Sequence, residues 1–235
     1  MKKTMMILAA LSLACILAVG STMSYLTYTD YDVNTMVVGN VKIDQLEQKR
    51  NGDAFVDEVK LLPVTSTATE EVAINGTNYQ LLSTAKNAVD KIVTVQNTGS
   101  EDAYVRTLFA FEMLNNGDGT WSNPFAGNLK MVANGDYMTD VTFEKNGTQY
   151  IVGVCTYADA LVKDEVSAPS LLQIYLDSAE EGAFYKGAGA SYEILVLSQA
   201  VQAAGFGSAS EALDAAFGAV DAANAATWFA GVNAA

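Results

Sequence analysis

The side chains that most often carry out enzymatic chemistry are scarce in this 235-residue chain. It contains no histidine and only two cysteines, Cys15 and Cys155. Serine hydrolases and cysteine proteases use a histidine base, and nearly all familiar zinc centres use histidine or several cysteines. The composition therefore excludes these classes of site. We predict that the protein is not an enzyme and carries no cofactor.

Two other kinds of site depend on carboxylates or oxygen ligands. Paired carboxylates hydrolyse glycosides, but no two of the 27 acidic residues stand out by their context, and surface solvation is the favoured role. The segment Asn115–Gly119 (Asn-Asn-Gly-Asp-Gly) offers oxygens to Ca²⁺. It lacks the spacing and the terminal glutamate of an EF-hand. We interpret it as a turn, and we predict no catalytic or metal-binding residue.

Trp121 and Cys155 are the remaining side chains with distinctive chemistry. Trp121 lies in the loop Gly119–Pro124 and is the candidate for stacking on a sugar. As a core residue it would need a hydrogen-bond partner for its Nε1–H. Cys155 lies in the apolar, strand-like run Tyr150–Tyr157, and it is the only cysteine left once an N-terminal signal is removed. We therefore expect no internal disulfide and a buried, inert thiol.

The balance of charge restricts the classes of partner. The chain has 13 basic and 27 acidic residues, a formal net charge of −14, and 50% of its residues are hydrophobic. A surface this acidic repels nucleic acid and anionic lipid, so we predict neither as a partner. The high apolar content indicates a folded domain and not a disordered acidic tail.

The N-terminus has the pattern of a secretion signal. Lys2 and Lys3 precede the apolar run Met5–Val19, and small or hydroxylated residues follow as far as Ser24. The run is shorter than the roughly 20 residues needed to cross a bilayer, and no basic cluster follows it. We predict that a signal peptide, residues 1–24, is removed between Ser24 and Tyr25, which leaves a secreted chain without a stable membrane anchor.

Most of the remaining chain has the pattern of short strands separated by turns. The alternation or the β-branched content of strands occurs in segments 41–45, 91–97, 103–113, 141–144, 149–155, 170–176 and 192–198. The pair 91–97 and 103–113 is the strongest hairpin signal, and Asn146–Gly147 marks a second hairpin. Strands at this spacing predict an all-β domain, a β-sandwich or jelly roll, over residues 41–235.

The C-terminal region has a different period. Apolar residues spaced as on one helical face occur at Ala209, Ala212, Leu213, Ala216, Phe217 and Val220. This spacing predicts a short helix from about residue 208, capped by Ser208 or Ser210. We expect it to pack on the edge of the sheet. The alanine-rich last dozen residues have no clear period.

Four segments resemble one known family. The junction Gly20–Asp30 resembles the export signals that the SipW-type signal peptidase of Gram-positive bacteria cleaves. Segment 32–43 is similar to the entry into the family's first strand, and segments 91–106 and 194–206 resemble its hairpin and its closing strand. The chain thus resembles the TasA/camelysin-like group of secreted proteins. It departs from the group in having Tyr25-Leu26 where an aromatic pair is usual.

The resemblance implies a jelly-roll domain and a structural role in extracellular fibres of a biofilm matrix. It also implies a mechanism, in which an N-terminal strand freed by the signal peptidase inserts into the sheet of the next subunit. The candidate donor strand spans residues 25–40, with apolar contacts from Tyr25, Leu26, Tyr28, Tyr31, Val33, Met36, Val37 and Val38. The expected partners are further copies of this chain, other matrix proteins, and the signal peptidase during export.

Two alternatives stay open. Residues 25–40 are almost as well interpreted as the first strand of the chain's own sheet. The protein is alternatively a secreted β-sandwich adhesion or carbohydrate-binding module, in which Trp121 contacts the glycan. Metalloprotease activity, described for camelysin-like members, is not expected because the chain has no histidine for a zinc site.

Overall fold

The computed structural model describes residues 27–30, 41–54, 61–127, 129–134, 138–179 and 192–232. The predicted signal peptide, residues 1–24, and the predicted cleavage site at Ser24 and Tyr25 lie outside the described residues. Most of the candidate donor strand also lies outside them, namely Leu26, Tyr31, Val33, Met36, Val37 and Val38.

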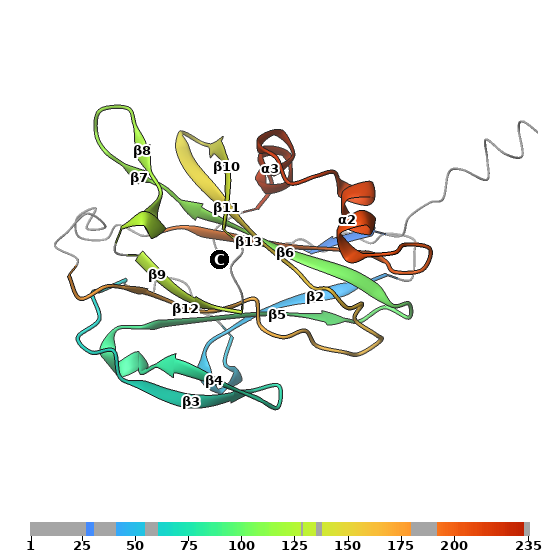
Figure 1. Ribbon diagram of the computed structural model, residues 1–235, viewed down its shortest axis with the longest axis horizontal. Coiled ribbons are helices and arrows are strands. Elements are labelled where there is room, and N and C mark those ends of the chain that lie inside the picture. Colours follow the sequence, from blue (N-terminus) through green and yellow to red (C-terminus); the bar gives the residue numbers. More distant parts are fainter. Residues whose placement is uncertain are drawn as a thin grey trace, which may run out of the picture.

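Two antiparallel sheets stack face to face (Figure 1). The five-stranded sheet contains, in order, β1 (Thr27–Asp30), β13 (Ile194–Gln202), β6 (Ala103–Glu112), β11 (Thr148–Thr156) and β10 (Met138–Lys145). The four-stranded sheet contains β2 (Ile43–Gln48), β5 (Val89–Asn97), β12 (Leu171–Leu176) and β9 (Leu129–Ala133). The prediction of an all-β sandwich is therefore confirmed.

Apolar side chains from both sheets meet between them. The central cluster consists of Val93, Leu129, Leu171, Ile174 and Leu176 from the four-stranded sheet, with Phe109, Phe111, Ile151 and Val196 from the five-stranded sheet. Phe109 and Phe111 stand two residues apart in β6, so strand alternation directs both rings into the same layer. Phe125 adds an edge-on contact to Phe111 at 4.8 Å between ring centroids. This cluster holds the two sheets together.

The predicted hairpin of segments 91–97 and 103–113 is wrong, because β5 and β6 belong to different sheets. Both strands are buried along nearly their whole length, and each has a partner strand on either side. The turn Thr98–Asp102 instead carries the chain from one sheet to the other. At this corner the side-chain amide of Asn97 donates to the backbone oxygens of Glu101 (2.9 Å) and Leu161 (2.8 Å).

Asn-Gly pairs close two true hairpins. Asn146–Gly147 joins β10 to β11, as predicted, and Asn75–Gly76 joins β3 (Thr69–Ile74) to β4 (Thr77–Leu82). The φ angles are 53° and 82° in the first turn and 49° and 79° in the second. Asn and Gly tolerate these values, which two-residue hairpin loops require. A smaller hairpin joins β7 (Leu114–Asn115) to β8 (Trp121–Ser122).

Two short helices cover the outer face of the five-stranded sheet (Figure 1). α2 (Ala209–Phe217) begins after Ser208, whose Oγ accepts the Glu211 N–H at 3.3 Å, so the predicted cap is confirmed. The sequence pattern did not predict α3 (Ala222–Phe229), which Asp221 caps. α2 packs on β13 and β6, and α3 packs on β10. The helices therefore lie on the face of the sheet and not, as predicted, on its edge.

Candidate functional site at the edge of the five-stranded sheet

The N-terminal strand β1 lies at one edge of the five-stranded sheet and pairs with only part of β13. Thr27 to Asp30 run antiparallel to Val201 to Ser198. The first half of β13, Ile194–Leu197, pairs with β6 on one side and has no strand on the other among the described residues. We call the side of β13 that faces β1, over Ile194–Gln202, the acceptor edge.

Main-chain groups of β13 point toward the acceptor edge where β1 does not cover it. The Glu112 N–H donates to the Glu193 oxygen at 3.1 Å. The next pair along the ladder, Phe111 with Ile194, is therefore a non-hydrogen-bonded pair of β6 and β13. Residues of such pairs direct their N–H and C=O groups away from the partner strand, so Ile194 and Val196 present theirs at the acceptor edge. A row of such groups is a template for pairing with another strand.

Packing on both faces fixes the position of β13. Val196, which is 5% exposed, belongs to the core between the sheets, and Ile194 packs against the same cluster. Leu195 and Leu197 face the opposite way and share a cluster with Phe229 of α3. Because these contacts come from the sandwich and from α3, they hold β13 in place whether or not β1 is paired with it.

The buried hydroxyl groups of Thr107 in β6 and Ser198 in β13 connect the five-stranded sheet to β2 of the other sheet. Thr107 Oγ1 lies 3.1 Å from Ser198 Oγ, and both residues are fully buried. Ser198 Oγ donates to Gln45 Oε1 of β2 at 2.8 Å. A satisfied buried hydrogen bond contributes roughly 1 kcal/mol to stability. These bonds set the alignment of β13 over β2.

Arg106 is a buried residue of β6, the strand that pairs with β13 on the side away from the acceptor edge. Arg106 donates from Nε to Gln199 Oε1 at 2.7 Å, from Nη1 to Asp214 at 2.8 Å, and from Nη2 to the Gly218 oxygen at 3.0 Å. Its guanidinium also lies over the Trp228 ring, 5.0 Å from the centroid. Burial lowers the pKa of Arg106, and the carboxylate of Asp214 opposes that shift. Arg106 therefore ties β6, β13, α2 and α3 together.

Gln199 is fully buried, yet half of its amide lacks a partner. Its Oε1 accepts from Arg106, whereas no described group accepts from its Nε2. Sequence reasoning missed both residues. An arginine within an apolar strand was the available signal, because a buried charge is normally paired. Its partners are 93 to 112 positions away in the chain, so no local pattern identifies them.

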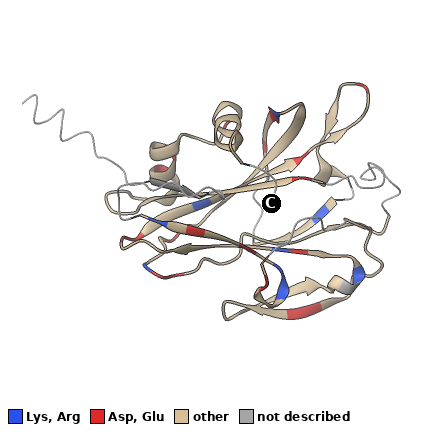
Figure 2. Cartoon of the chain, turned by 180° about the vertical axis from the view of Figure 1, so that it is seen from behind, with Lys and Arg blue, Asp and Glu red and all other residues tan. Residues whose placement is uncertain are grey.

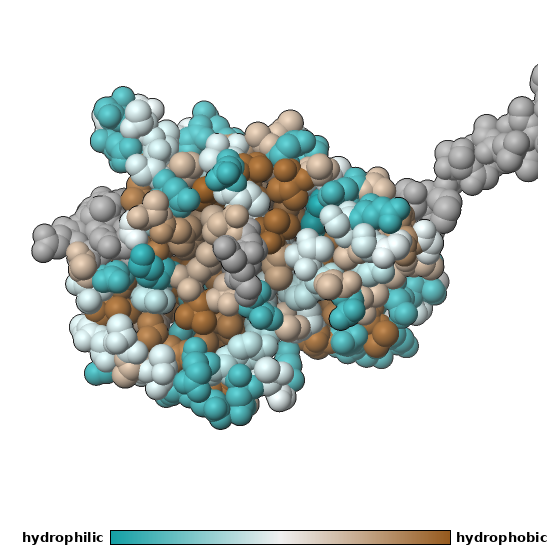
Figure 3. All heavy atoms as spheres, viewed as in Figure 1, coloured by the Kyte–Doolittle hydropathy of each residue, from teal (hydrophilic) through white to brown (hydrophobic). Residues whose placement is uncertain are grey.

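The sequence-predicted residues fall in different places. Tyr28 lies in β1, where its backbone pairs with Ala200 of the acceptor edge. Trp121 is half-buried in β8, opposite Asn115 in the small hairpin, and the described structure does not bring it to the acceptor edge. The tip of this hairpin is hydrophilic (Figure 3). Cys155 in β11 is half-buried, and burial raises the pKa of its thiol to about 11, which suits an inert thiol.

The loop Asn115–Gly119 uses its oxygens internally. Asn115 Oδ1 accepts the Gly117 N–H at 2.8 Å. Asp118 Oδ1 accepts the backbone N–H of Thr120 at 3.0 Å and its hydroxyl at 2.6 Å, and these bonds lower the pKa of Asp118. The loop is therefore a turn, as expected from its sequence.

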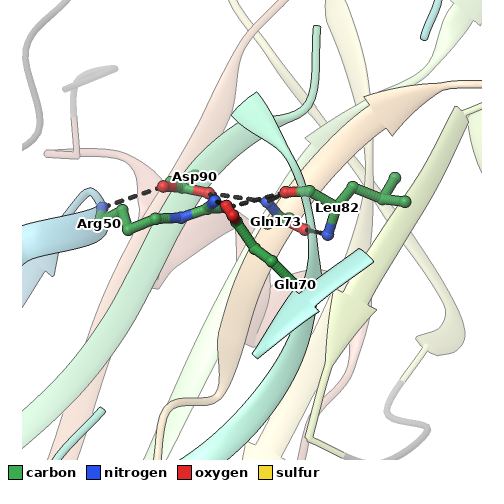
Figure 4. A network of polar contacts seen from close by, with 5 residues as sticks. All are labelled: Arg50, Glu70, Leu82, Asp90 and Gln173. Atoms are coloured by element: carbon green, nitrogen blue, oxygen red, sulfur yellow. Dashed lines mark hydrogen bonds and ion pairs between the residues drawn. The ribbon is translucent and has the colours of Figure 1, made fainter. Parts of the chain in front are cut away.

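A second polar region attaches the β3–β4 hairpin to the four-stranded sheet (Figure 4). Gln173 of β12 accepts the Leu82 N–H with Oε1 and donates to the Leu82 oxygen with Nε2, both at 2.8 Å. The same Nε2 donates to Asp90 at 2.8 Å. Arg50 donates to Asp90 from its backbone N and from Nη2, each at 3.0 Å, and it pairs with Glu70 of β3. Gln173 thus bonds Leu82 in the way that a neighbouring strand would.

A groove of about 470 Å³ lies beside this network, between β3 and the 3₁₀ turn η1 (Arg50–Gly52). Its lining includes Lys49, Arg50, Glu70 and Glu71, so positive and negative charges balance within it. Acidic residues lie on elements of both sheets, and β3 at the bottom of Figure 2 carries an acidic stretch. Charged side chains on an edge strand oppose pairing with other strands. We assign this groove no ligand.

Comparison of the chain with protein-family models, with curated proteins and with solved structures finds no match. Among the described residues, no helix combines the length and the apolar character that membrane crossing needs. The same part of the chain contains no group of three or more histidine, cysteine, aspartate or glutamate residues arranged to hold a metal ion.

Proposed function

We propose that this chain is a secreted structural protein of the extracellular matrix or cell surface, with a jelly-roll domain that assembles into fibres by N-terminal strand donation. One observation carries the proposal. The N-terminal strand β1 is the edge strand of the five-stranded sheet, where Thr27 to Asp30 form an antiparallel main-chain ladder with Val201 to Ser198 of β13.

A main-chain ladder is suited to exchange between subunits. Its hydrogen bonds join backbone groups, so β1 of one chain and β1 of a second copy make the same bonds with β13. Exchange of an identical element between copies is a low-cost route to association. If the donated strand keeps the register of Tyr28 with Ala200, its Tyr31 and Val33 stand opposite Leu197 and Leu195. A donated strand then covers the whole acceptor edge.

The rest of the proposal rests on the sequence. The pattern of Lys2, Lys3 and the apolar run up to Val19 supports export and cleavage near Ser24. Cleavage there frees the segment that contains β1. Without Lys2 and Lys3 the cleaved chain has 11 basic and 27 acidic residues, a formal net charge of −16. We expect this charge to oppose association, and screening by salt or cations to favour it.

The test compares the chain from Tyr25 to Ala235 with a chain that starts at Asn40 and lacks β1. Electron microscopy and sedimentation then measure assembly, and circular dichroism checks that both chains are folded. We expect filaments from the first chain and monomers from the second. Monomers from both over a wide range of concentration and pH would contradict strand donation, and glycan binding with its loss in Trp121→Ala would then favour an adhesion module.

A substitution at the acceptor edge tests the other half of the mechanism. Ile194→Pro removes the N–H that this first residue of β13 presents at the edge, at a position where a strand tolerates proline. Ile194→Ala is the matched control, because it shortens the same side chain and keeps the N–H. We expect the proline variant to block assembly and the alanine variant to assemble. Equal assembly by both variants would exclude this edge as the acceptor.

A further inference from the structure

The three methionines among the described residues pack against one apolar cluster. Met113 follows β6, Met131 lies in β9 and Met138 begins β10, so they come from both sheets. Each is half-buried and contacts the central cluster between the sheets. We propose that Met113, Met131 and Met138 form an oxidation site, at which a peroxide converts the thioethers to sulfoxides and weakens the sandwich. This effect belongs to the single chain and does not depend on assembly.

The topology places two of these methionines at the borders of the sandwich. β9 and β10 are edge strands, and each has a partner strand on one side only among the described residues. β1 and β2, the opposite edge strands of the two sheets, contact one another, so β9 and β10 lie together on the other side of the sandwich. Met138 also stands opposite Gly153, which has no side chain to cover it. We therefore expect a small oxidant to reach these sulfur atoms while the chain is folded.

The oxidant itself balances the reaction. The thioether sulfur takes one oxygen atom from the peroxide, the O–O bond breaks, and the peroxide is reduced to water or an alcohol. A flexible apolar side chain is thereby replaced by a polar sulfoxide. The cluster consists of apolar side chains, such as Val93, Phe109 and Leu129, which supply no hydrogen-bond donor to the new oxygen. Because a buried polar group without a partner destabilises the folded state, oxidation opposes the packing of the two sheets.

Cys155 carries another sulfur atom that packs on this cluster, but its chemistry differs. Burial raises the pKa of its thiol to about 11, so the thiolate is a minor species at neutral pH. The thiolate is the form that a peroxide attacks. A thioether has no proton to lose, so its reaction depends on access and not on pH. The methionines are therefore the expected targets of a peroxide at neutral pH.

Peroxide treatment of the folded chain from Tyr25 to Ala235, followed by urea unfolding, tests the inference. Peptide mass spectrometry locates the added oxygen atoms, and we expect them at the three methionines. We expect the unfolding midpoint to fall, with the folding equilibrium constant lowered on the order of tenfold for each sulfoxide. Reduction of the unfolded chain by methionine sulfoxide reductases, followed by refolding, should restore the midpoint.

A variant in which leucine replaces all three methionines (Met113→Leu, Met131→Leu and Met138→Leu) is the matched control. Leucine has nearly the same volume and no sulfur atom. The variant keeps Met36 and Cys155, so an effect of oxidation elsewhere in the chain would persist in it. We expect peroxide to leave its midpoint unchanged. An equal fall in both proteins, methionines that stay unmodified until the chain unfolds, or sulfoxides without a fall in the midpoint would overturn the inference.

Discussion

The β3–β4 hairpin and the strand β1 are both peripheral to the sandwich, but they are attached in different ways. The hairpin is joined to the four-stranded sheet by a network of side chains from Arg50, Asp90 and Gln173, of which Asp90 and Gln173 are buried. β1 is joined to the five-stranded sheet by a ladder of four residue pairs with β13. One attachment depends on particular side chains, and the other uses bonds that any strand can make.

This difference is the basis for the proposal that β1 is exchanged between subunits while the hairpin stays in place. In the network around Asp90, the polar groups share partners, so the loss of one residue removes a hydrogen bond from several of the others. A short edge ladder loses only main-chain bonds, which water or another strand can replace. On this comparison we expect the hairpin to be part of the stable subunit, and we propose β1 as the element that is exchanged.

The largest effect is expected for Asp90→Ala. The Asp90 side chain is 2% exposed and accepts from Arg50 and Gln173. Its loss removes the acceptor of the Arg50 backbone N–H and one acceptor each from the Arg50 guanidinium and the Gln173 amide, so we expect a loss of about 3 kcal/mol in the free energy of unfolding by urea. The control is Glu71→Ala on the exposed side of the same hairpin, with a change within about 0.5 kcal/mol. A loss below about 1 kcal/mol for Asp90→Ala would mean that the network is not what secures the hairpin.

A smaller loss is expected for Gln173→Met. The substitution keeps the length of a fully buried side chain and removes both of its bonds to the Leu82 backbone. The Leu82 N–H then loses its acceptor, whereas the Leu82 oxygen still accepts from Arg50 Nη2 at 2.8 Å. We expect about 2 kcal/mol of destabilisation with faster hydrogen exchange at the Leu82 amide. Gln80→Met on the exposed part of β4 is the control. Unchanged exchange at Leu82 would show that another group pairs with it.

Removal of β1 is expected to cost less than either substitution. A chain that starts at Asn40 loses a four-pair ladder and keeps every contact of β13 with the core and with α3. We expect a loss of about 1–2 kcal/mol, measured by urea unfolding of the monomer. A loss as large as that of Asp90→Ala would indicate that β1 is a fixed part of the subunit and would argue against exchange.

The smallest effect of β1 removal is expected at Cys155. Burial raises the pKa of this thiol to about 11 from an ordinary value of 9.0, so the thiolate is a minor species at pH 8. Alkylation at pH 8 should be slow, and its rate should rise as the pH approaches 11. Since the thiol is kept neutral in the folded state, its contribution to stability is present below pH 9 and is lost between pH 9 and 11.

β11 does not contact β1 in the sheet order, so the alkylation rate of Cys155 should be the same in the chain without β1. A faster rate in the shorter chain would mean that β1 stabilises the centre of the sheet.

Local signals in the sequence predicted local structure well. Asn146–Gly147 closes a hairpin because both residues tolerate positive φ, and Ser208 caps α2 through its own hydroxyl. The same reasoning failed for β5 and β6, because an alternating pattern does not specify the partner strand. It also missed α3, whose buried face consists of Ala225 and Phe229 and gives little apolar periodicity.

The sequence by itself determined the all-β class, the acidic surface, the lack of histidine chemistry, and the turns and caps, because these depend on composition or on neighbouring residues. Only the tertiary structure decided that β5 and β6 lie in different sheets, that Arg106 meets Gln199 and Asp214, and that β1 covers part of the acceptor edge. The physical reason is that strand pairing and buried polar contacts join residues about a hundred positions apart, and the stability of each pair depends on the packing of the whole sandwich.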